Sequence, residues 1–187
     1  VVLDKPAGMT SHDCVARIRR LFRTKKVGHA GTLDPDVTGV LPVCLGHATR
    51  LVEYLQDLPK RYDVVMRLGS STTTEDAAGE RVEHVPVDSA EITTERLNDV
   101  FSQFLGEIEQ VPPMYSAVKI NGKRLYQLAR EGEVVERPAR KVTIYELDLH
   151  DIRPDGDGVD VHFSCTCSKG TYVRTLCVDL GRALGYP

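Results

Sequence analysis

Short apolar or alternating stretches along the chain predict β-strands, because side chains in a strand point to opposite faces in turn. In the clearest stretch, Tyr62, Val64 and Met66 fall on one face and Val65 on the other. The strands predicted in this way cover residues 1–4, 60–68, 81–87, 141–152 and 159–167. The apolar stretch 40–45 is expected to be buried.

Apolar residues spaced three and four apart predict amphipathic helices between these strands. In the first helix, Val15, Ile18 and Phe22 are expected to face the core, and Thr10 or Ser11 to cap the N-terminus. The helices predicted in this way cover residues 10–22, 47–56, 93–105, 125–130 and 171–184.

Helices and strands are mixed without strict β-α-β alternation, and the sequence contains no internal repeat or linker. This order favours an α+β fold with a mixed, largely antiparallel sheet flanked by helices. Asn121-Gly122, between two short extended stretches, predicts a hairpin or turn. With 187 residues the chain can form one sizeable domain, residues 1–187, and both of its ends are expected to be cut.

Composition excludes several classes of protein. No apolar stretch approaches the roughly 20 residues of a membrane span, and no signal-peptide pattern opens the chain. The five cysteines are odd in number and scattered, which argues against a disulfide framework. Cys165 and Cys167 share a strand face, but no second Cys or His pair at zinc spacing accompanies them. We therefore expect a reduced cytoplasmic protein without a metal site.

The net charge of −3 gives no general sign of nucleic-acid binding, but the charges are unevenly distributed. Residues 75–109 hold ten acids and two bases. Between Asp13 and Asp34 there is no acid, and the bases are Arg17, Arg19, Arg20, Arg23, Lys25 and Lys26. Such a cluster is typical of phosphate contacts. A solvated helix face is the alternative interpretation.

Residues 28–39, Gly-His-Ala-Gly-Thr-Leu-Asp-Pro-Asp-Val-Thr-Gly, have no apolar periodicity and are predicted to be neither helix nor strand. Asp34 precedes Pro35, which disfavours the helical conformation at Asp34 and stiffens the chain. The Asp34 carboxylate is therefore expected to lie on a rigid loop. A tight surface turn would explain the same residues.

A carboxylate that acts in catalysis needs a cation to hold it ionised and aimed. Arg174 is the best candidate, because it falls in the first turn of a predicted helix, where the helix dipole disfavours a cation without a specific partner. An ordinary surface arginine is the alternative interpretation. Tyr62, after Lys60-Arg61, offers a flat ring for stacking on a base, with core packing as the alternative. Asp76 can brace its own loop.

Other chemistries find no support in the sequence. A P-loop, a GxGxxG fingerprint, an HExxH motif and a GxSxG motif are all absent. The reaction is therefore expected to be redox-neutral and to use side chains alone, without a cofactor.

Five motifs in order carry a resemblance to a known family. They are Asp-Lys-Pro-Ala-Gly-Met-Thr-Ser at 4–11, Gly-His-Ala-Gly-Thr-Leu-Asp-Pro at 28–35, Thr-Gly-Val-Leu-Pro-Val-Cys-Leu-Gly at 38–46, Lys-Arg-Tyr at 60–62, and Ser-Lys-Gly-Thr-Tyr-Val-Arg at 168–174. The chain resembles the TruB family of tRNA pseudouridine synthases over nearly its whole length. The resemblance implies the pseudouridine synthase fold with a central RNA-binding cleft. It also implies isomerisation of uridine to pseudouridine at position 55, in the T-loop of tRNA.

The resemblance also implies roles for single residues. Asp34 matches the catalytic aspartate, which acts at the ribose–uracil junction. Tyr62 matches the tyrosine that stacks on the target base and is proposed to take a proton late in the reaction. Arg174 matches the arginine that pairs with the catalytic carboxylate.

Further matches concern RNA contacts and support. His29 matches the histidine that enters the T-loop, Asp76 an aspartate near the flipped nucleotide, and Lys5-Pro6 a motif that braces the site. The RNA contacts expected besides His29 and Asp76 are Lys5, Arg20, Arg23, Lys26, Lys60 and Lys169. We expect tRNA, bound through its T-arm, as the partner of a monomer without an obligate protein partner.

The family continues past this terminus with a Leu-Arg-rich segment and a PUA domain, neither of which is in this sequence. Three other functions stay open. The chain could bind or fold tRNA without turnover, or it could be a related synthase that is guided by an RNA or acts on another RNA. A glycoside or nucleoside hydrolase fits less well, because no second carboxylate is convincingly placed beside Asp34.

Overall fold

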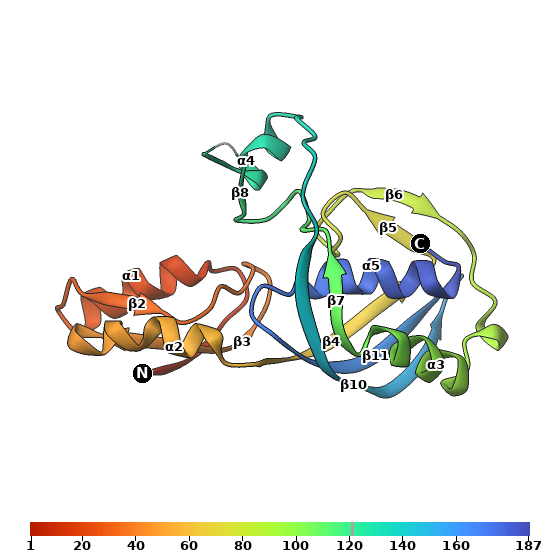
Figure 1. Ribbon diagram of the computed structural model, residues 1–187, viewed down its shortest axis with the longest axis horizontal. Helices are drawn as coiled ribbons and strands as arrows, with labels where there is room; N and C mark the ends of the chain where they lie inside the picture. Colours follow the sequence, from red (N-terminus) through yellow and green to blue (C-terminus); the bar gives the residue numbers. More distant parts are fainter. Residues whose placement is uncertain (121) are drawn as a thin grey trace. The chain divides into compact units, whose positions relative to one another are not determined.

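The computed structural model describes residues 1–120 and 122–187. The chain divides into two compact units, Val1–Leu58 (unit 1) and Pro59–Pro187 (unit 2), whose elements are labelled in Figure 1. Each unit has a hydrophobic core of its own. That residues 1–187 make up one catalytic domain stays a prediction.

Unit 1 is built on a three-stranded antiparallel sheet with the order β1-β3-β2. Its strands are β1 (Val2–Lys5), β2 (Val27–His29) and β3 (Gly39–Leu45), and its helices are α1 (Ser11–Leu21), the 3-10 helix η1 (Gly46–Leu51) and α2 (Val52–Asp57). The core lies between α1 and the sheet and contains Cys14, Val15, Ile18, Val27, Leu41 and Val43.

The first predicted helix is confirmed, with Thr10 as its cap. The Thr10 hydroxyl accepts from the Asp13 backbone N–H, and the Asp13 carboxylate accepts from the Thr10 backbone N–H, both at 3.0 Å. The prediction that Phe22 faces the core is wrong, since this residue is 49% exposed. Phe22 lies beyond the last helical residue as the C-cap of α1, and the chain leaves the helical conformation at Arg23, whose φ is 48°.

The prediction that residues 28–39 contain no strand is wrong at both ends. His29 is the last residue of β2 and Gly39 the first of β3. Both are strand residues because they pair with segments distant along the chain, His29 with Val43 and Gly39 with Lys5. Residues 30–38, here called the Asp34 loop, connect these strands.

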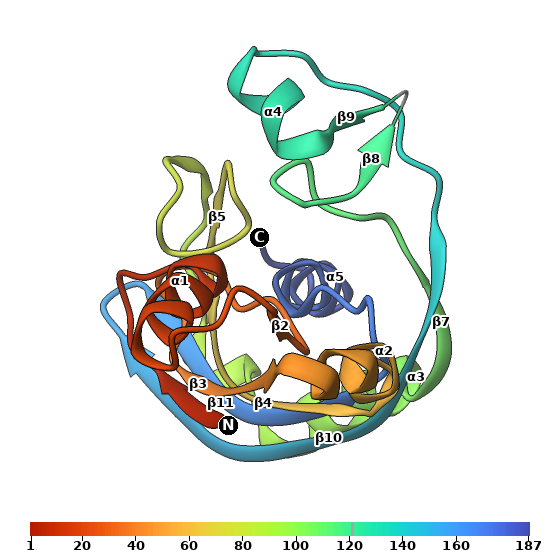
Figure 2. The same cartoon turned by 90° about the vertical axis from the view of Figure 1, so that its left-hand side faces the viewer.

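Unit 2 is built on a four-stranded antiparallel sheet with the order β4-β11-β10-β7. Its strands are β4 (Lys60–Leu68), β7 (Gly106–Gln110), β10 (Arg140–Asp155) and β11 (Gly158–Cys167). Helices α3 (Thr94–Phe104) and α5 (Val173–Leu184) pack on the same face of this sheet (Figures 1 and 2). Cys165 and Cys167 lie on that face and are fully buried, as the alternation predicted.

Two segments between the strands of this sheet form structure outside it. The first is the hairpin of β5 (Ser70–Thr72) and β6 (Arg81–His84), followed by the 3-10 helix η2 (Ser89–Glu91). The second, between β7 and β10, holds β8 (Lys119–Ile120), β9 (Lys123–Arg124) and α4 (Leu125–Arg130). Strands β8 and β9 pair as the hairpin signal predicted, although Asn121 itself lies outside the described residues.

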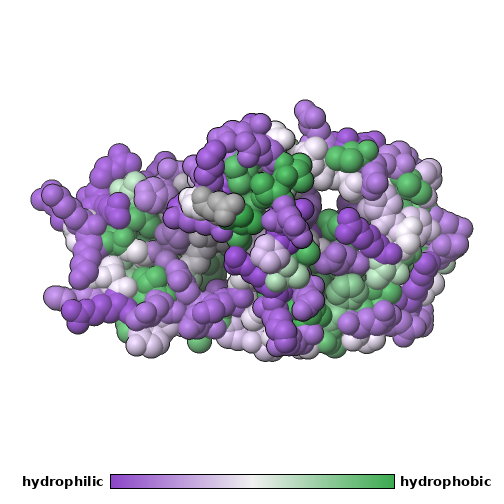
Figure 3. Space-filling model, turned by 45° about the horizontal axis from the view of Figure 1, so that its top comes forward, coloured by the Kyte–Doolittle hydropathy of each residue, from purple (hydrophilic) through white to green (hydrophobic). Residues whose placement is uncertain are grey.

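The expected α+β class with a largely antiparallel sheet is confirmed. The face drawn in Figure 3 is mostly hydrophilic, with smaller hydrophobic areas between the hydrophilic side chains. None of the helices in the described residues has the length and apolar character that a membrane crossing requires.

Candidate active site

Asp34 is exposed, and the backbone on its C-terminal side is held by a buried lysine. Lys5, the last residue of β1, has no exposed surface. Its ammonium donates to the carbonyl oxygens of Pro6 at 2.9 Å, Pro35 at 2.9 Å and Val37 at 2.7 Å. A buried ammonium is tolerated only when its N–H groups are satisfied, and these three acceptors match its three donors. Lys5 therefore ties the Asp34 loop to the first strand.

The backbone on the N-terminal side of Asp34 is held by a buried serine. The Ser11 hydroxyl donates to the Leu33 carbonyl at 3.2 Å and accepts from the Leu33 N–H at 3.0 Å. The Gly8 N–H adds a bond to the Pro35 carbonyl at 2.9 Å. Both neighbours of Asp34 are thus fixed while its side chain stays accessible, which confirms the rigid loop expected from the sequence.

The structure contradicts the placement of Lys5 among the RNA contacts. Its side chain is fully buried, and its donors are directed at protein carbonyls, so it has no surface to offer to a phosphate. The bracing role that the resemblance implied for Lys5 and Pro6 agrees with this geometry. Ser11 was considered only as a helix cap, and its bond to Leu33 was missed.

The other unit 1 residues expected at the site have different surroundings. His29 is half-buried in β2, and its Nδ1 contacts the Gly31 carbonyl, which orients the ring. Arg20, Arg23 and Lys26 are exposed at and after the C-terminal end of α1. Their contacts with RNA stay predictions.

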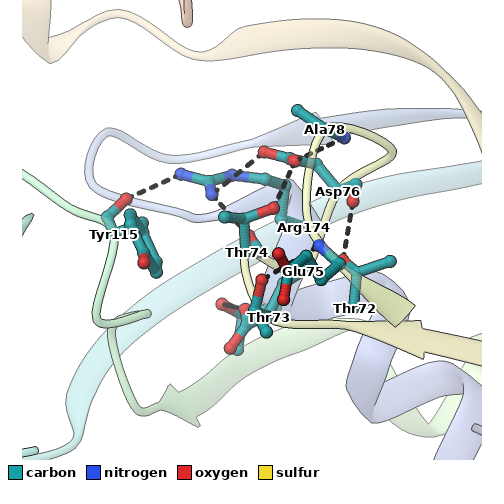
Figure 4. Close-up of polar contacts among 10 residues, drawn as sticks. Thr72, Thr73, Thr74, Glu75, Asp76, Ala78, Tyr115 and Arg174 are labelled. Carbon is teal, nitrogen blue, oxygen red and sulfur yellow. Dashed lines mark hydrogen bonds and ion pairs between the residues drawn. The ribbon is translucent and has the colours of Figure 1, made fainter. Parts of the chain in front are cut away.

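In unit 2, Arg174 is held by two segments that lie far apart in sequence (Figure 4). Within this unit its guanidinium donates to the Thr74 carbonyl at 2.7 Å, the Asp76 carboxylate at 3.2 Å and the Tyr115 carbonyl at 2.9 Å. Only 18% of its side chain is exposed. The expectation of a specific partner for Arg174 is confirmed through Asp76, whereas its pairing with Asp34 stays a prediction.

Asp76 braces the loop between β5 and β6, as the sequence suggested. Its carboxylate accepts from the Thr74 hydroxyl at 2.6 Å and from the Ala78 N–H at 3.0 Å. The Thr72 hydroxyl donates to the Asp76 carbonyl at 2.6 Å. The carboxylate that pairs with Arg174 is therefore itself fixed in place. Its position near a flipped nucleotide stays a prediction.

Two further contacts hold the start of α5, and neither was predicted. The Gln110 side-chain amide bonds both the N–H and the carbonyl of Tyr172. The Thr175 hydroxyl donates to the Glu75 carboxylate at 2.6 Å. Both contacts join residues distant in sequence, and Gln110, Glu75 and Thr175 lie outside the five motifs.

The remaining predicted residues of unit 2 lie on β4 and before α5. Tyr62 is half-buried, packs against the core and pairs in register with Cys165, so core packing accounts for part of its ring. Lys60 is half-buried opposite Cys167, and Lys169 is exposed in the loop before α5. Their roles toward RNA stay predictions, as does the central RNA-binding cleft.

In residues 1–120 and 122–187, no cluster of three or more His, Cys, Asp or Glu could hold a metal ion.

Comparison with solved structures places the fold among pseudouridine synthases. The chain matches a chain of an H/ACA RNP bound to a substrate RNA containing 2'-deoxyuridine with a TM-score of 0.66 and 31% identity, over 98% of this chain and 43% of that one. It matches a chain of a Cbf5-Nop10-Gar1 complex with a TM-score of 0.66 and 34% identity, over 98% of this chain and 44% of that one.

The model of the TruB family pseudouridylate synthase (N terminal domain) matches residues 19–173, and the chain belongs to this family. The tRNA pseudouridine synthase B of Halalkalibacterium halodurans is 56% identical over 99% of this chain and 61% of its own length. Those of Geobacillus kaustophilus and Bacillus subtilis are 57% and 55% identical over all of this chain and 66% and 60% of their lengths. The chain thus spans about three fifths of these relatives. The family resemblance predicted from the motifs is confirmed.

Proposed function

We propose that this chain carries the catalytic part of a tRNA pseudouridine synthase that isomerises uridine 55 in the T-loop of tRNA. Relatives at 55–57% identity bear the name of that enzyme. The observation that carries the proposal is the exposed Asp34 on a loop fixed from both sides, inside the stretch that matches the family. A carboxylate held in this way can act at a reacting centre without first being ordered.

In this reaction Asp34 assists the cleavage of the bond between ribose carbon 1′ and uracil nitrogen 1. The uracil then rotates and rejoins ribose carbon 1′ through its carbon 5. The proton on carbon 5 leaves, with Tyr62 as its proposed acceptor, and nitrogen 1 ends protonated. No atoms are gained or lost, so the isomerisation needs no cofactor. Arg174 would keep the Asp34 carboxylate ionised.

A uracil inside a folded T-loop must be flipped out before it can react, at a cost of a few kcal/mol. His29 entering the loop, Asp76 near the flipped nucleotide and phosphate contacts would offset this cost. The basic residues proposed for the phosphate contacts are Arg20, Arg23, Lys26, Lys60 and Lys169. The enzyme would act in the cytoplasm as a monomer, without a partner protein or a guide RNA.

The test compares Asp34→Asn with Asp36→Asn, a matched change at an exposed residue of the same loop. Each protein is incubated with a T-arm RNA, the RNA is digested, and its nucleosides are quantified by mass spectrometry. Asp34→Asn is expected to abolish pseudouridine while RNA binding persists, and Asp36→Asn to retain activity. Pseudouridine formation by Asp34→Asn would refute the catalytic role, and release of free uracil would instead indicate a hydrolase.

A tRNA-folding protein is the second candidate function, because the basic residues after α1 are exposed. In that case Asp34→Asn would leave the effect on tRNA folding unchanged. Activity of the isolated protein on a bare T-arm would exclude the need for a guide RNA.

A further inference from the structure

Helix α5 begins without a side-chain cap of its own. Tyr172 is its N-cap residue and has no side-chain hydrogen bond to the helix, and Arg174 is the second helical residue. The first turn of a helix leaves backbone N–H groups without helical partners, so an uncapped start tends to fray. Fraying would move Arg174, so other contacts must hold this turn.

The first such contact comes from Gln110, the last residue of β7, which is 2% exposed. Its side-chain oxygen accepts from the Tyr172 N–H at 2.8 Å, and its side-chain NH₂ donates to the Tyr172 carbonyl at 3.1 Å. Two antiparallel bonds of this kind fix both the position and the orientation of a peptide, as they do between neighbouring strands. Gln110 therefore locks the backbone two residues before Arg174.

The second contact comes from Glu75, whose φ of 61° is unusual for a residue other than glycine. Its carboxylate accepts from the hydroxyl of Thr175, which is 7% exposed. Because Asp76 pairs with Arg174, two consecutive acids bind two consecutive residues of the first turn of α5. Left-handed backbone outside glycine persists where the surrounding contacts enforce it, and it is frequent at functional sites.

We propose that Gln110 and Glu75 are positioning residues that aim the Arg174 guanidinium. Gln110 fixes the chain before Arg174, and Glu75 fixes the residue after it, so the direction of the arginine side chain follows from both. The inference rests on the proposed function, in which Arg174 acts on the catalytic carboxylate. Misplacement of a catalytic group by about 1 Å can slow a reaction about 100-fold.

The test uses Gln110→Met, which keeps the length of the side chain but removes the amide, and Glu75→Leu, which removes the acceptor. Glu75→Gln keeps an acceptor oxygen and is the rescuing variant. Gln103→Met is the matched control, because Gln103 is exposed on α3 and bonds only within its own helix in the described contacts. We expect the single-turnover rate to fall about 10- to 100-fold for the first two variants, with the affinity for tRNA changed less than about twofold. Glu75→Gln and Gln103→Met should remain near the wild-type rate.

A readout independent of activity is the ¹⁵N–¹H resonance of the Arg174 Nε–H group, assigned by its loss in Arg174→Lys. Gln110→Met and Glu75→Leu should shift or broaden it, and Gln103→Met should not. An unchanged Arg174 resonance, or an unchanged rate per folded molecule, would overturn the inference. Wild-type protein that forms no pseudouridine would refute the proposed function instead, and the resonance would still decide the inference.

Discussion

Replacing Lys5 by methionine removes the one ammonium that ties the Asp34 loop to β1 in the described contacts, while it keeps the length and apolar stem of the side chain. The Pro35 carbonyl retains the bond from the Gly8 N–H after the change. The carbonyls of Pro6 and Val37 lose the Lys5 donor. The variant therefore isolates the effect of the buried ammonium on the loop.

The expected loss of stability follows from the hydrogen bonds that the variant removes. A hydrogen bond to a charged group contributes about 1.5–3 kcal/mol, and two carbonyls lose such a bond, which gives about 3–6 kcal/mol. Removing a buried charge recovers part of this, because its desolvation no longer opposes folding. We expect Lys5→Met to lower the free energy of unfolding by about 3 kcal/mol. At about 2–4 °C per kcal/mol for a chain of this size, the melting temperature should fall by about 6–12 °C.

Urea unfolding measures the free energy of unfolding, and the rate of single-turnover pseudouridine formation measures the activity of the site. The rate per folded molecule should also fall, because the backbone that carries Asp34 is no longer fixed. Lys25→Met, at an exposed lysine of the same unit, is the control and should change stability by less than about 0.5 kcal/mol. If Lys5→Met matched this control in both stability and rate, the bracing role would be refuted.

Four further predictions follow from ionisable side chains. Neutralising the exposed bases Arg20, Arg23 and Lys26 should weaken tRNA binding and make its salt dependence shallower, and unchanged binding at every salt concentration would leave them as a solvated face. Burial raises the pKa of Asp179, so its charge opposes folding at neutral pH, and Asp179→Asn should raise the melting temperature at pH 7 but not below about pH 4. The Thr10 hydroxyl lowers the pKa of Asp13, so Asp13→Asn should lower the melting temperature at pH 7, with the loss fading as pH falls through the lowered pKa. Burial raises the pKa of the Cys177 thiol to about 12, so alkylation of Cys177 at pH 7, followed by mass spectrometry, should be much slower in native protein than in urea.

Local sequence patterns predicted the helices and strands that are stabilised by contacts between residues close in sequence. Thr10 was a candidate cap for the first helix and caps α1 as predicted, whereas the reciprocal bond from Asp13 was not predicted. The alternation around Tyr62 and Met66 gave both the strand and its buried face. Asp34 was expected on a rigid loop because of Pro35, and the loop is fixed.

Local patterns could not predict the contacts that hold the site, because their partners are distant in sequence, and only the bracing by Lys5 was implied, through the family resemblance. Ser11 bonds a residue 22 positions away and Lys5 one 30 positions away. Gln110 and Glu75 reach across 62 and 100 positions. A serine, a glutamine and a glutamate are common on surfaces, and no spacing distinguishes these three from the rest. The strand ending at His29 was missed for the same reason, since its partner β3 begins ten residues later in chain order.

The anchoring of the Asp34 loop has a consequence for protein engineering. The groups that set its conformation, Lys5 and Ser11, lie outside the loop, on the first strand and at the start of the first helix. A graft of residues 28–39 onto another scaffold would carry the carboxylate without its supports. The smallest portable module is therefore β1, α1 and the loop together with its flanking strands β2 and β3, because β1 is itself held by pairing with β3.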